Sequence, residues 1–117
     1  MKNSVQILLI VLIALLSRDA LAENSSSGNF MLPHCKKLIE GKSYGVWEGH
    51  CAGLVSSLAW VGGLLATESR FCPPNDATAL QTQRVVVGYL EQYPEFLHFD
   101  FRTLALTALQ RAWPCAK

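Results

Sequence analysis

Charged residues are scarce in this chain of 117 amino acids, of which 16% are charged and 50% are apolar. A disordered protein has more charge and fewer apolar residues, so the composition excludes that class. Apart from Lys36-Lys37 there is no cluster of lysine or arginine, which excludes the basic surface that nucleic acids and anionic membranes require. At this length the chain forms one compact domain at most.

The chain also lacks the residue patterns of metal sites and of common catalytic centres. No Cys-x-x-Cys or His-x-x-x-His pair is present, whereas structural zinc sites usually take ligands from such pairs. There is no glycine-rich phosphate loop and no acidic pair at the spacing of a general acid and base. The sequence therefore predicts a protein that is not an enzyme and that uses no metal ion or cofactor.

One long apolar run is present, at the N-terminus. Lys2 precedes ten consecutive apolar residues at 7–16, and the triplet Ala20-Leu21-Ala22 follows them. This arrangement is typical of a secretory signal peptide. Ten apolar residues are too few to cross a bilayer core, which takes about 20 in a helix. We expect residues 1–22 to be cleaved and the mature protein to be released into the periplasm without a membrane anchor.

The expected mature chain has no net charge, because residues 23–117 contain eight basic and eight acidic residues. Its first part, residues 23–28, is polar and is expected to be flexible. Residues 29–117 form the predicted domain. A domain of this size buries only about two thirds of its unfolded surface, so covalent cross-links matter for its stability.

Apolar residues recur at intervals of three and four, which predicts helices, and no alternating strand pattern is present. A short first helix is expected within residues 29–40, with Pro33 restricting it to the later part. A second helix is expected over 47–65, about six turns long. Glycines and alanines on its other faces predict that this second helix is the buried, central one.

Two further helices are predicted from their ends. Thr78 and Gln81 form a capping box, so the third helix begins at residue 79, and Pro94 ends it. Asp100 caps the fourth helix, which Pro114 ends. Four helices with short connections predict an all-α, up-and-down bundle.

Four cysteines in an exported protein indicate two disulfides, and three pairings are possible. In an antiparallel bundle Cys35 and Cys51 lie toward one end, whereas Cys72 and Cys115 follow helices that finish at the other end. We therefore predict the bonds Cys35–Cys51 and Cys72–Cys115. In the chain-entropy model these loops contribute about 3 and about 4 kcal/mol.

The run 49–53, Gly-His-Cys-Ala-Gly, has the spacing of a nucleophile elbow with cysteine in the place of serine. An elbow requires a strand before the nucleophile, whereas Cys51 lies within a continuous helical pattern. Neighbouring helical residues point about 100° apart, so His50 cannot serve Cys51 as a base. A hydrogen bond at an end of the bundle is the expected role of each histidine, and capping or solvation is the expected role of each carboxylate.

Three tryptophans are unusual in so small a domain. Trp47 and Trp113 fall on inward-facing stripes and are expected to lie in the core. Trp60 lies off the stripe of its helix. It either packs against the first helix or belongs to an exposed interface.

The order of cysteine, proline, polar and aromatic positions from Cys35 to Cys115 resembles the Rap/Tai family of immunity proteins associated with type VI secretion. The segments that carry the resemblance are Cys51-Ala52-Gly53-Leu54-Val55, Cys72-Pro73-Pro74, Thr78-x-x-Gln81, Val86-Val87, Tyr89-Leu90, Pro94-Glu95-x-Leu97-His98, Ala108-Leu109 and Ala112-Trp113-Pro114-Cys115. The resemblance implies a periplasmic, all-helical protein, often a homodimer, that binds a peptidoglycan amidase effector and blocks its active-site groove.

Two loops are candidates for the blocking element, 68–77 and 92–100. We favour 68–77, because Cys72 anchors it and two prolines stiffen it. Its expected contact residues are Glu68, Arg70, Asn75 and Asp76. The alternative functions are a small disulfide-bonded periplasmic chaperone, for which eight acidic groups make a weak acid trigger, and an envelope stress or structural protein without a toxin partner.

Overall fold

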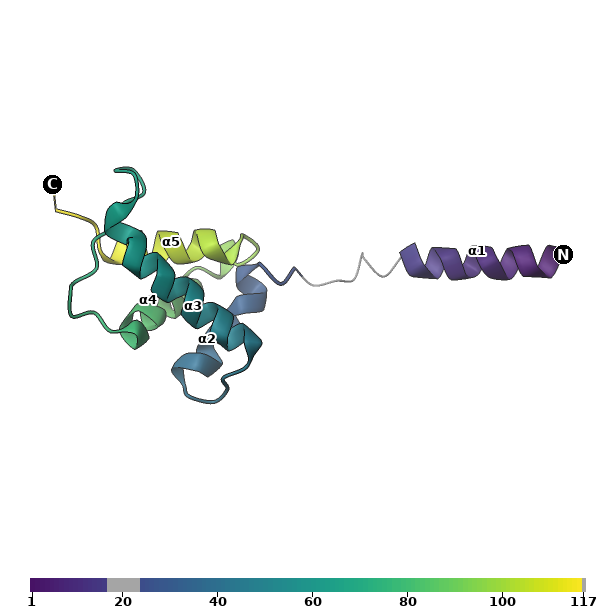
Figure 1. The fold of residues 1–117 in the computed structure, drawn as a ribbon, viewed down its shortest axis with the longest axis horizontal. Helices are drawn as coiled ribbons and strands as arrows, with labels where there is room; N and C mark the ends of the chain where they lie inside the picture. Colours follow the sequence, from purple (N-terminus) through teal and green to yellow (C-terminus); the bar gives the residue numbers. More distant parts are fainter. Residues whose placement is uncertain (17–23, 117) are drawn as a thin grey trace.

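The computed structural model describes residues 1–16 and 24–116. Its elements in chain order are α1 (Lys2–Leu16), α2 (Gly28–Ile39), α3 (Val46–Val61), the 3-10 turn η2 (Gly62–Leu64), α4 (Ala79–Gln92), the 3-10 turn η3 (Pro94–Phe96) and α5 (Phe101–Ala112) (Figure 1). The all-α class with two disulfides is confirmed. Residues 17–22 of the expected signal peptide and residue 23 lie outside the described part.

The centre of the helical domain is α4, which packs against α2, α3 and α5. The expectation that the second mature helix, α3, is the buried one is wrong. Only Glu48, Cys51 and Val55 of α3 are buried. The glycines of α3 do not mark close packing, because a Cβ added at Gly49 or Gly53 would meet no other atom within 4 Å. The buried apolar residues are Met31, Cys35, Cys51, Val55, Phe71, Val86, Val87, Leu90, Phe101, Leu104, Ala105, Ala108 and Leu109.

Both ends of α3 differ in part from the prediction. The helix begins at Val46, near the expected start, but it ends at Val61 instead of continuing to Leu65. Gly62 begins η2 and is buried against Phe71, and Leu65 is already extended. The apolar spacing continues past the true end because Gly62 is buried and Leu65 still packs against the core.

The start of the domain also differs from the prediction, since residues 26–28 are held in place rather than flexible. Ser27 is 6% exposed, and its Oγ accepts a hydrogen bond from the Phe30 amide at 3.2 Å. The Phe101 amide donates to the Ser26 carbonyl at 2.7 Å, and the Gly28 amide donates to the Phe99 carbonyl at 3.0 Å. These residues make backbone hydrogen bonds to the start of α5, which polarity alone does not reveal.

This docking also explains why Pro33 does not restrict α2 to its later part. The helix begins at Gly28 and includes Pro33. A proline inside a helix removes one backbone donor and usually kinks or breaks the helix, but α2 continues through Pro33 to Ile39. The Ser27 cap compensates by satisfying a free amide of the first turn.

The predicted caps and ends of the last two helices are confirmed. Thr78 Oγ1 accepts a hydrogen bond from the Gln81 amide at 3.1 Å, and Asp100 Oδ1 accepts one from the Arg102 amide at 2.9 Å. The helices end at Gln92 and Ala112, each two residues before a proline.

Both predicted disulfides are present. Cys35 and Cys51 join α2 to α3 with a Cα–Cα distance of 5.6 Å, and both residues are buried. Cys72 and Cys115 join the chain after α3 to the end of α5 at 4.9 Å, and this bond lies at the surface. Among the described residues no cysteine is free.

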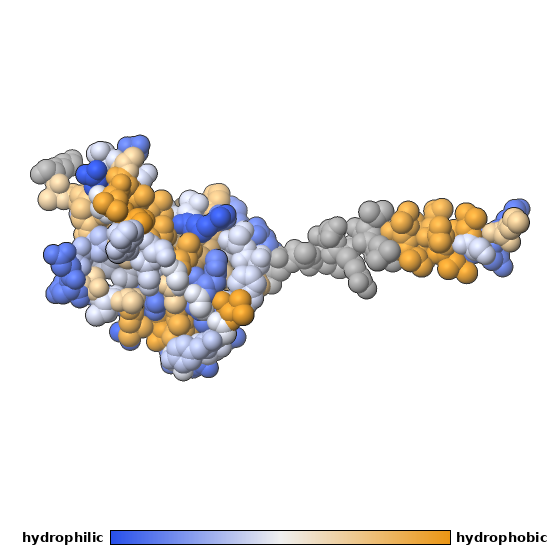
Figure 2. Space-filling model, in the orientation of Figure 1, coloured by the Kyte–Doolittle hydropathy of each residue, from blue (hydrophilic) through white to orange (hydrophobic). Residues whose placement is uncertain are grey.

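Helix α1 coincides with the apolar part of the expected signal peptide. Its side chains from Lys2 to Ile13 are exposed, and hydrophobic residues dominate its visible side in Figure 2. Within the described residues, every helix is too short or too polar to cross a membrane.

Candidate functional site

The loop 68–77, called here the Cys72 loop, follows a turn that projects beyond the end of α3 (Figure 1). Phe71 fixes the loop to the domain, because its side chain is fully buried. The Phe71 amide donates to the Gly62 carbonyl at 3.3 Å. An alanine Cβ placed at Gly62 would lie 2.6 Å from the Phe71 ring. Only glycine therefore allows the ring to approach the backbone this closely.

Helix α5 and the residues after it hold the other side of the loop. The Cys72 amide donates to the Trp113 carbonyl at 2.8 Å, and Gln110 Nε2 donates to the Ser69 carbonyl at 2.8 Å. The Cys72–Cys115 disulfide adds a covalent link at the same place. The start of the loop is thus fixed by two hydrogen bonds and a disulfide.

The second half of the Cys72 loop forms a tight turn at the surface. The Ala77 amide donates to the Pro74 carbonyl at 3.0 Å, and Asn75 and Asp76 between them are exposed. Prolines at 73 and 74 fix two backbone φ angles. Thr78 then caps α4 directly after the turn. The exposed tip therefore has rigid connections on both sides.

A groove of about 570 Å³ separates the Cys72 loop from the end of α3. Its lining residues are Ala59, Trp60, Gly63, Cys72, Pro73, Pro74, Asn75, Ala77 and Thr82. Trp60 is 78% exposed, which supports the interface role and not the packing role that the sequence left open. The groove thus combines an exposed indole with a rigid, proline-containing wall.

Only one of the four expected contact residues lines this groove. Glu68, Arg70, Asn75 and Asp76 are all exposed, but only Asn75 is part of the lining. Arg70 Nε donates to the Leu65 carbonyl at 3.2 Å, so the Arg70 guanidinium lies beside the residues that precede the loop and not at its tip. The buried Phe71 separates Glu68 and Arg70 from the tip that carries Asn75 and Asp76.

The contribution of α3 to this site was missed at the sequence level. Ala59, Trp60 and Gly63 lie on one side of α3 and η2, facing the loop. The position of Trp60 off the apolar stripe was the available signal. The other wall of the groove is the Cys72 loop, and the spacing of apolar residues along α3 does not predict that this loop folds back beside Trp60.

The inner side of the alternative loop, 92–100, is hydrogen-bonded to the start of α2. The Asn29 amide donates to the Leu97 carbonyl at 2.8 Å, and the Gly28 amide to the Phe99 carbonyl. Phe96 and Phe99 remain 36% and 49% exposed. The His98 ring lies against Phe99 at an interplanar angle of 36°, with centroids 4.1 Å apart. This loop supports the start of α2 and displays aromatic rings outward.

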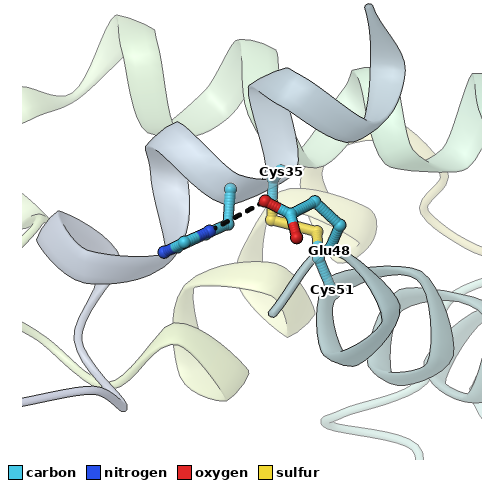
Figure 3. The surroundings of a disulfide bond; sticks show 4 residues. Cys35, Glu48 and Cys51 are labelled. Carbon is cyan, nitrogen blue, oxygen red and sulfur yellow. Dashed lines mark hydrogen bonds and ion pairs between the residues drawn. A yellow bond between two sulfur atoms is a disulfide. The ribbon is translucent and has the colours of Figure 1, made fainter. Parts of the chain in front are cut away.

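The expected bundle-end hydrogen bond is confirmed for His34, and its partner is Glu48. His34 Nδ1 lies 2.9 Å from Glu48 Oε1. Figure 3 shows the Glu48 carboxylate beside the Cys35–Cys51 disulfide. Glu48 lies in the first turn of α3, as expected of a helix-end carboxylate, but it is 4% exposed, so solvation does not account for it. The hydrogen bond from His34 lowers the pKa of Glu48 and compensates for its burial.

Cys51 has no thiol in this structure, because its sulfur is bonded to Cys35. Trp47, expected in the core, is 37% exposed. It instead packs edge-on against Phe30, with ring centroids 4.8 Å apart, and against His50 at 6.0 Å. Trp113 is partly buried against the core. Trp47 and His50 thus form an aromatic edge together with Phe30 of α2.

A family model described as Rap1a immunity proteins matches residues 27–115. The matched region includes α2 to α5, the Cys72 loop and all four cysteines. No curated protein and no solved structure shows a significant match to the chain.

Proposed function

The chain belongs to the Rap1a immunity protein family, and from this premise we propose that it binds a peptidoglycan amidase effector in the periplasm and blocks its active-site groove. The family match supports an immunity function against an effector. The amidase class follows from the resemblance to the Rap/Tai proteins. The rigid Cys72 loop beside exposed Trp60 is the observation on this chain that supports the blocking mechanism.

An amidase groove has to admit an extended peptide, so a narrow, stiff loop is a suitable obstacle. Binding costs free energy when flexible segments become ordered. The Cys72 loop avoids most of that cost, because a disulfide, buried Phe71 and two prolines already fix it. We propose that its tip, Asn75 and Asp76, enters the effector groove.

Trp60 is proposed as the main apolar contact next to the tip. Tryptophan is enriched among the residues that dominate interface energies. Trp60 is 78% exposed and lies on the wall of the groove that the loop forms with α3. An effector surface that covers both Trp60 and the loop would bury this ring and exclude water from the tip.

The experiment measures inhibition of peptidoglycan hydrolysis by an amidase effector that the mature protein captures in a pull-down. Trp60→Ala and Asn75→Ala should each weaken inhibition by about tenfold or more, since dominant contacts contribute about 2 kcal/mol. Tyr44→Ala is the matched control, because Tyr44 is 77% exposed and precedes α3, about 20 Å along that helix from Trp60. Its inhibition should be unchanged.

Two outcomes would contradict the proposal. If no amidase is bound or inhibited, the effector class is wrong. If Trp60→Ala and Asn75→Ala inhibit normally while Phe96→Ala or Phe99→Ala abolishes inhibition, the blocking element is the loop 92–100 instead. Melting temperatures of the same preparations show whether a loss of inhibition reflects unfolding.

A further inference from the structure

A second groove, of about 440 Å³, lies between α4 and α5. Its lining residues are Arg84, Val85, Gly88, Tyr89, Gln92, Tyr93, Ala108, Arg111 and Ala112. Glycine and alanine keep the space between the helices open. A Cβ added at Gly88 would meet no other atom within 4 Å, so the groove is accessible there.

Arg111 is positioned in this groove by two tyrosine rings. Its guanidinium carbon lies 5.0 Å from the centroid of the Tyr93 ring and 5.8 Å from that of Tyr89. The two rings are 4.8 Å apart. Cation–π attraction to the two rings holds the guanidinium at this place. Its five N–H donors match the oxygens of a planar, anionic acceptor such as a carboxylate.

No carboxylate of the described residues pairs with either arginine of the groove. The four ion pairs of the described chain are His34–Glu48, Lys36–Glu91, Lys42–Glu40 and Arg102–Asp100. Glu91 is on α4 too, but its carboxylate is held by Lys36 of α2. Arg84 and Arg111 thus give the groove two positive charges that are not neutralised by an acidic side chain.

We propose that the groove between α4 and α5 binds an acidic segment of a protein partner, with a carboxylate held by Arg84 and Arg111. Carboxylates match the fork of guanidinium donors. The tyrosine rings and alanines offer apolar contact to the stem of an acidic side chain. Arg84 and Gln92 are about 12 Å apart along α4, which is the length of three or four extended residues.

This site is distinct from the Cys72 loop and goes beyond the proposed function. Thr82 lines the groove of the Cys72 loop, whereas Arg84 lines the present groove. Residues two positions apart on a helix point about 160° apart, because each residue turns it by about 100°. The two grooves therefore lie on opposite sides of α4, and both can be occupied at the same time.

The test is an NMR titration of the exported, purified protein, which needs no effector. The probe is the blocked peptide Glu-Ala-Glu, and its matched control is Gln-Ala-Gln. We expect the acidic peptide to shift the Gly88 amide signal and the side-chain Nε–H signals of Arg84 and Arg111. The shifts should weaken as salt is added, because charge interactions are screened.

Variants locate the interaction. Arg84→Gln and Arg111→Gln should each weaken peptide binding by about tenfold, since they remove charged hydrogen-bond donors. Arg70→Gln is the control, because Arg70 is exposed in the first half of the Cys72 loop and does not line this groove. It should bind the peptide like the unmodified protein.

Several outcomes would overturn the proposal. Equal shifts with Gln-Ala-Gln would mean that no carboxylate is recognised. Tighter binding of inorganic phosphate than of the acidic peptide would identify a phosphate site. Tighter binding of a peptidoglycan stem peptide would identify a cell-wall ligand in place of a protein. None of these results bears on inhibition through the Cys72 loop, so the two proposals fail separately.

Discussion

Replacing Gly62 by alanine tests the packing that positions the Cys72 loop. The new Cβ would lie 2.6, 2.7 and 2.9 Å from three carbons of the Phe71 ring. Real Cβ contacts are not this short, so the ring or the backbone has to move. Because Phe71 is fully buried, the ring has no free space to enter. Overpacking of this kind costs about 1–3 kcal/mol.

The neighbouring glycine provides a matched control. A Cβ at Gly63 would meet no other atom within 4 Å, and among the described residues only Gly41 has a positive φ. Alanine is therefore compatible with the backbone at both 62 and 63. At Gly63 it should leave stability unchanged or raise it by about 0.4–1 kcal/mol, through lower entropy of the unfolded chain.

Thermal unfolding followed by circular dichroism measures the difference. For a domain of this size 1 kcal/mol corresponds to about 4–8 °C. A cost of about 2 kcal/mol thus lowers the Tm of Gly62→Ala by about 8–16 °C, whereas that of Gly63→Ala stays the same or rises. In a Phe71→Leu background the effect of Gly62→Ala should shrink, because the clashing ring is gone.

Equal melting temperatures for Gly62→Ala and Gly63→Ala would refute the close approach of Phe71. So would a Gly62→Ala effect that is unchanged by Phe71→Leu. In either case the Cys72 loop would not be fixed to η2 as described.

Two further predictions concern reduction and pH. The Cys72–Cys115 bond lies at the surface, whereas Cys35–Cys51 is buried. At a low concentration of reductant, an alkylating agent should therefore label Cys72 and Cys115 before Cys35 and Cys51, as measured by peptide mass spectrometry. Labelling of both pairs at the same rate would contradict this. Arg102 lowers the pKa of Asp100 from 3.8 to about 2, so the stabilisation by ionised Asp100 is complete above pH 3.8 and is lost as the pH falls toward 2. Asp100→Asn should remove about 1 kcal/mol of this acid-sensitive stability. The Tm of the variant should therefore fall less between pH 5 and pH 2 than the Tm of the unmodified protein. An equal fall in both proteins would show that Asp100 does not contribute.

Features that depend on local chemistry were predictable from the sequence. Thr78 and Asp100 accept hydrogen bonds from amides two or three residues away, so their capping role requires no knowledge of the rest of the fold. Pro94 and Pro114 end helices because they lack a backbone donor. The cysteine pairing followed from the order and direction of the helices, which those caps and prolines already define.

Features that depend on long-range packing were not predictable. Ser27 looks like part of a polar linker, but it is buried because Asp100 lies beside it in an isolated bridge. Glu48 looks like a helix-start carboxylate, but His34 of the preceding helix meets it. Likewise, the groove at Trp60 exists only because the Cys72 loop folds back beside α3.

The position of the candidate site depends on α5 more than its lining residues indicate. No residue of α5 lines the groove beside Trp60. Nevertheless Gln110 holds the Ser69 carbonyl, Trp113 accepts from the Cys72 amide, and Cys115 completes the disulfide. These contacts connect the loop to a helix whose inner side is buried in the core. Because the loop is held by contacts to α5 and to η2, substitutions in either element should alter the geometry of the loop, although the substituted residues do not contact a bound effector.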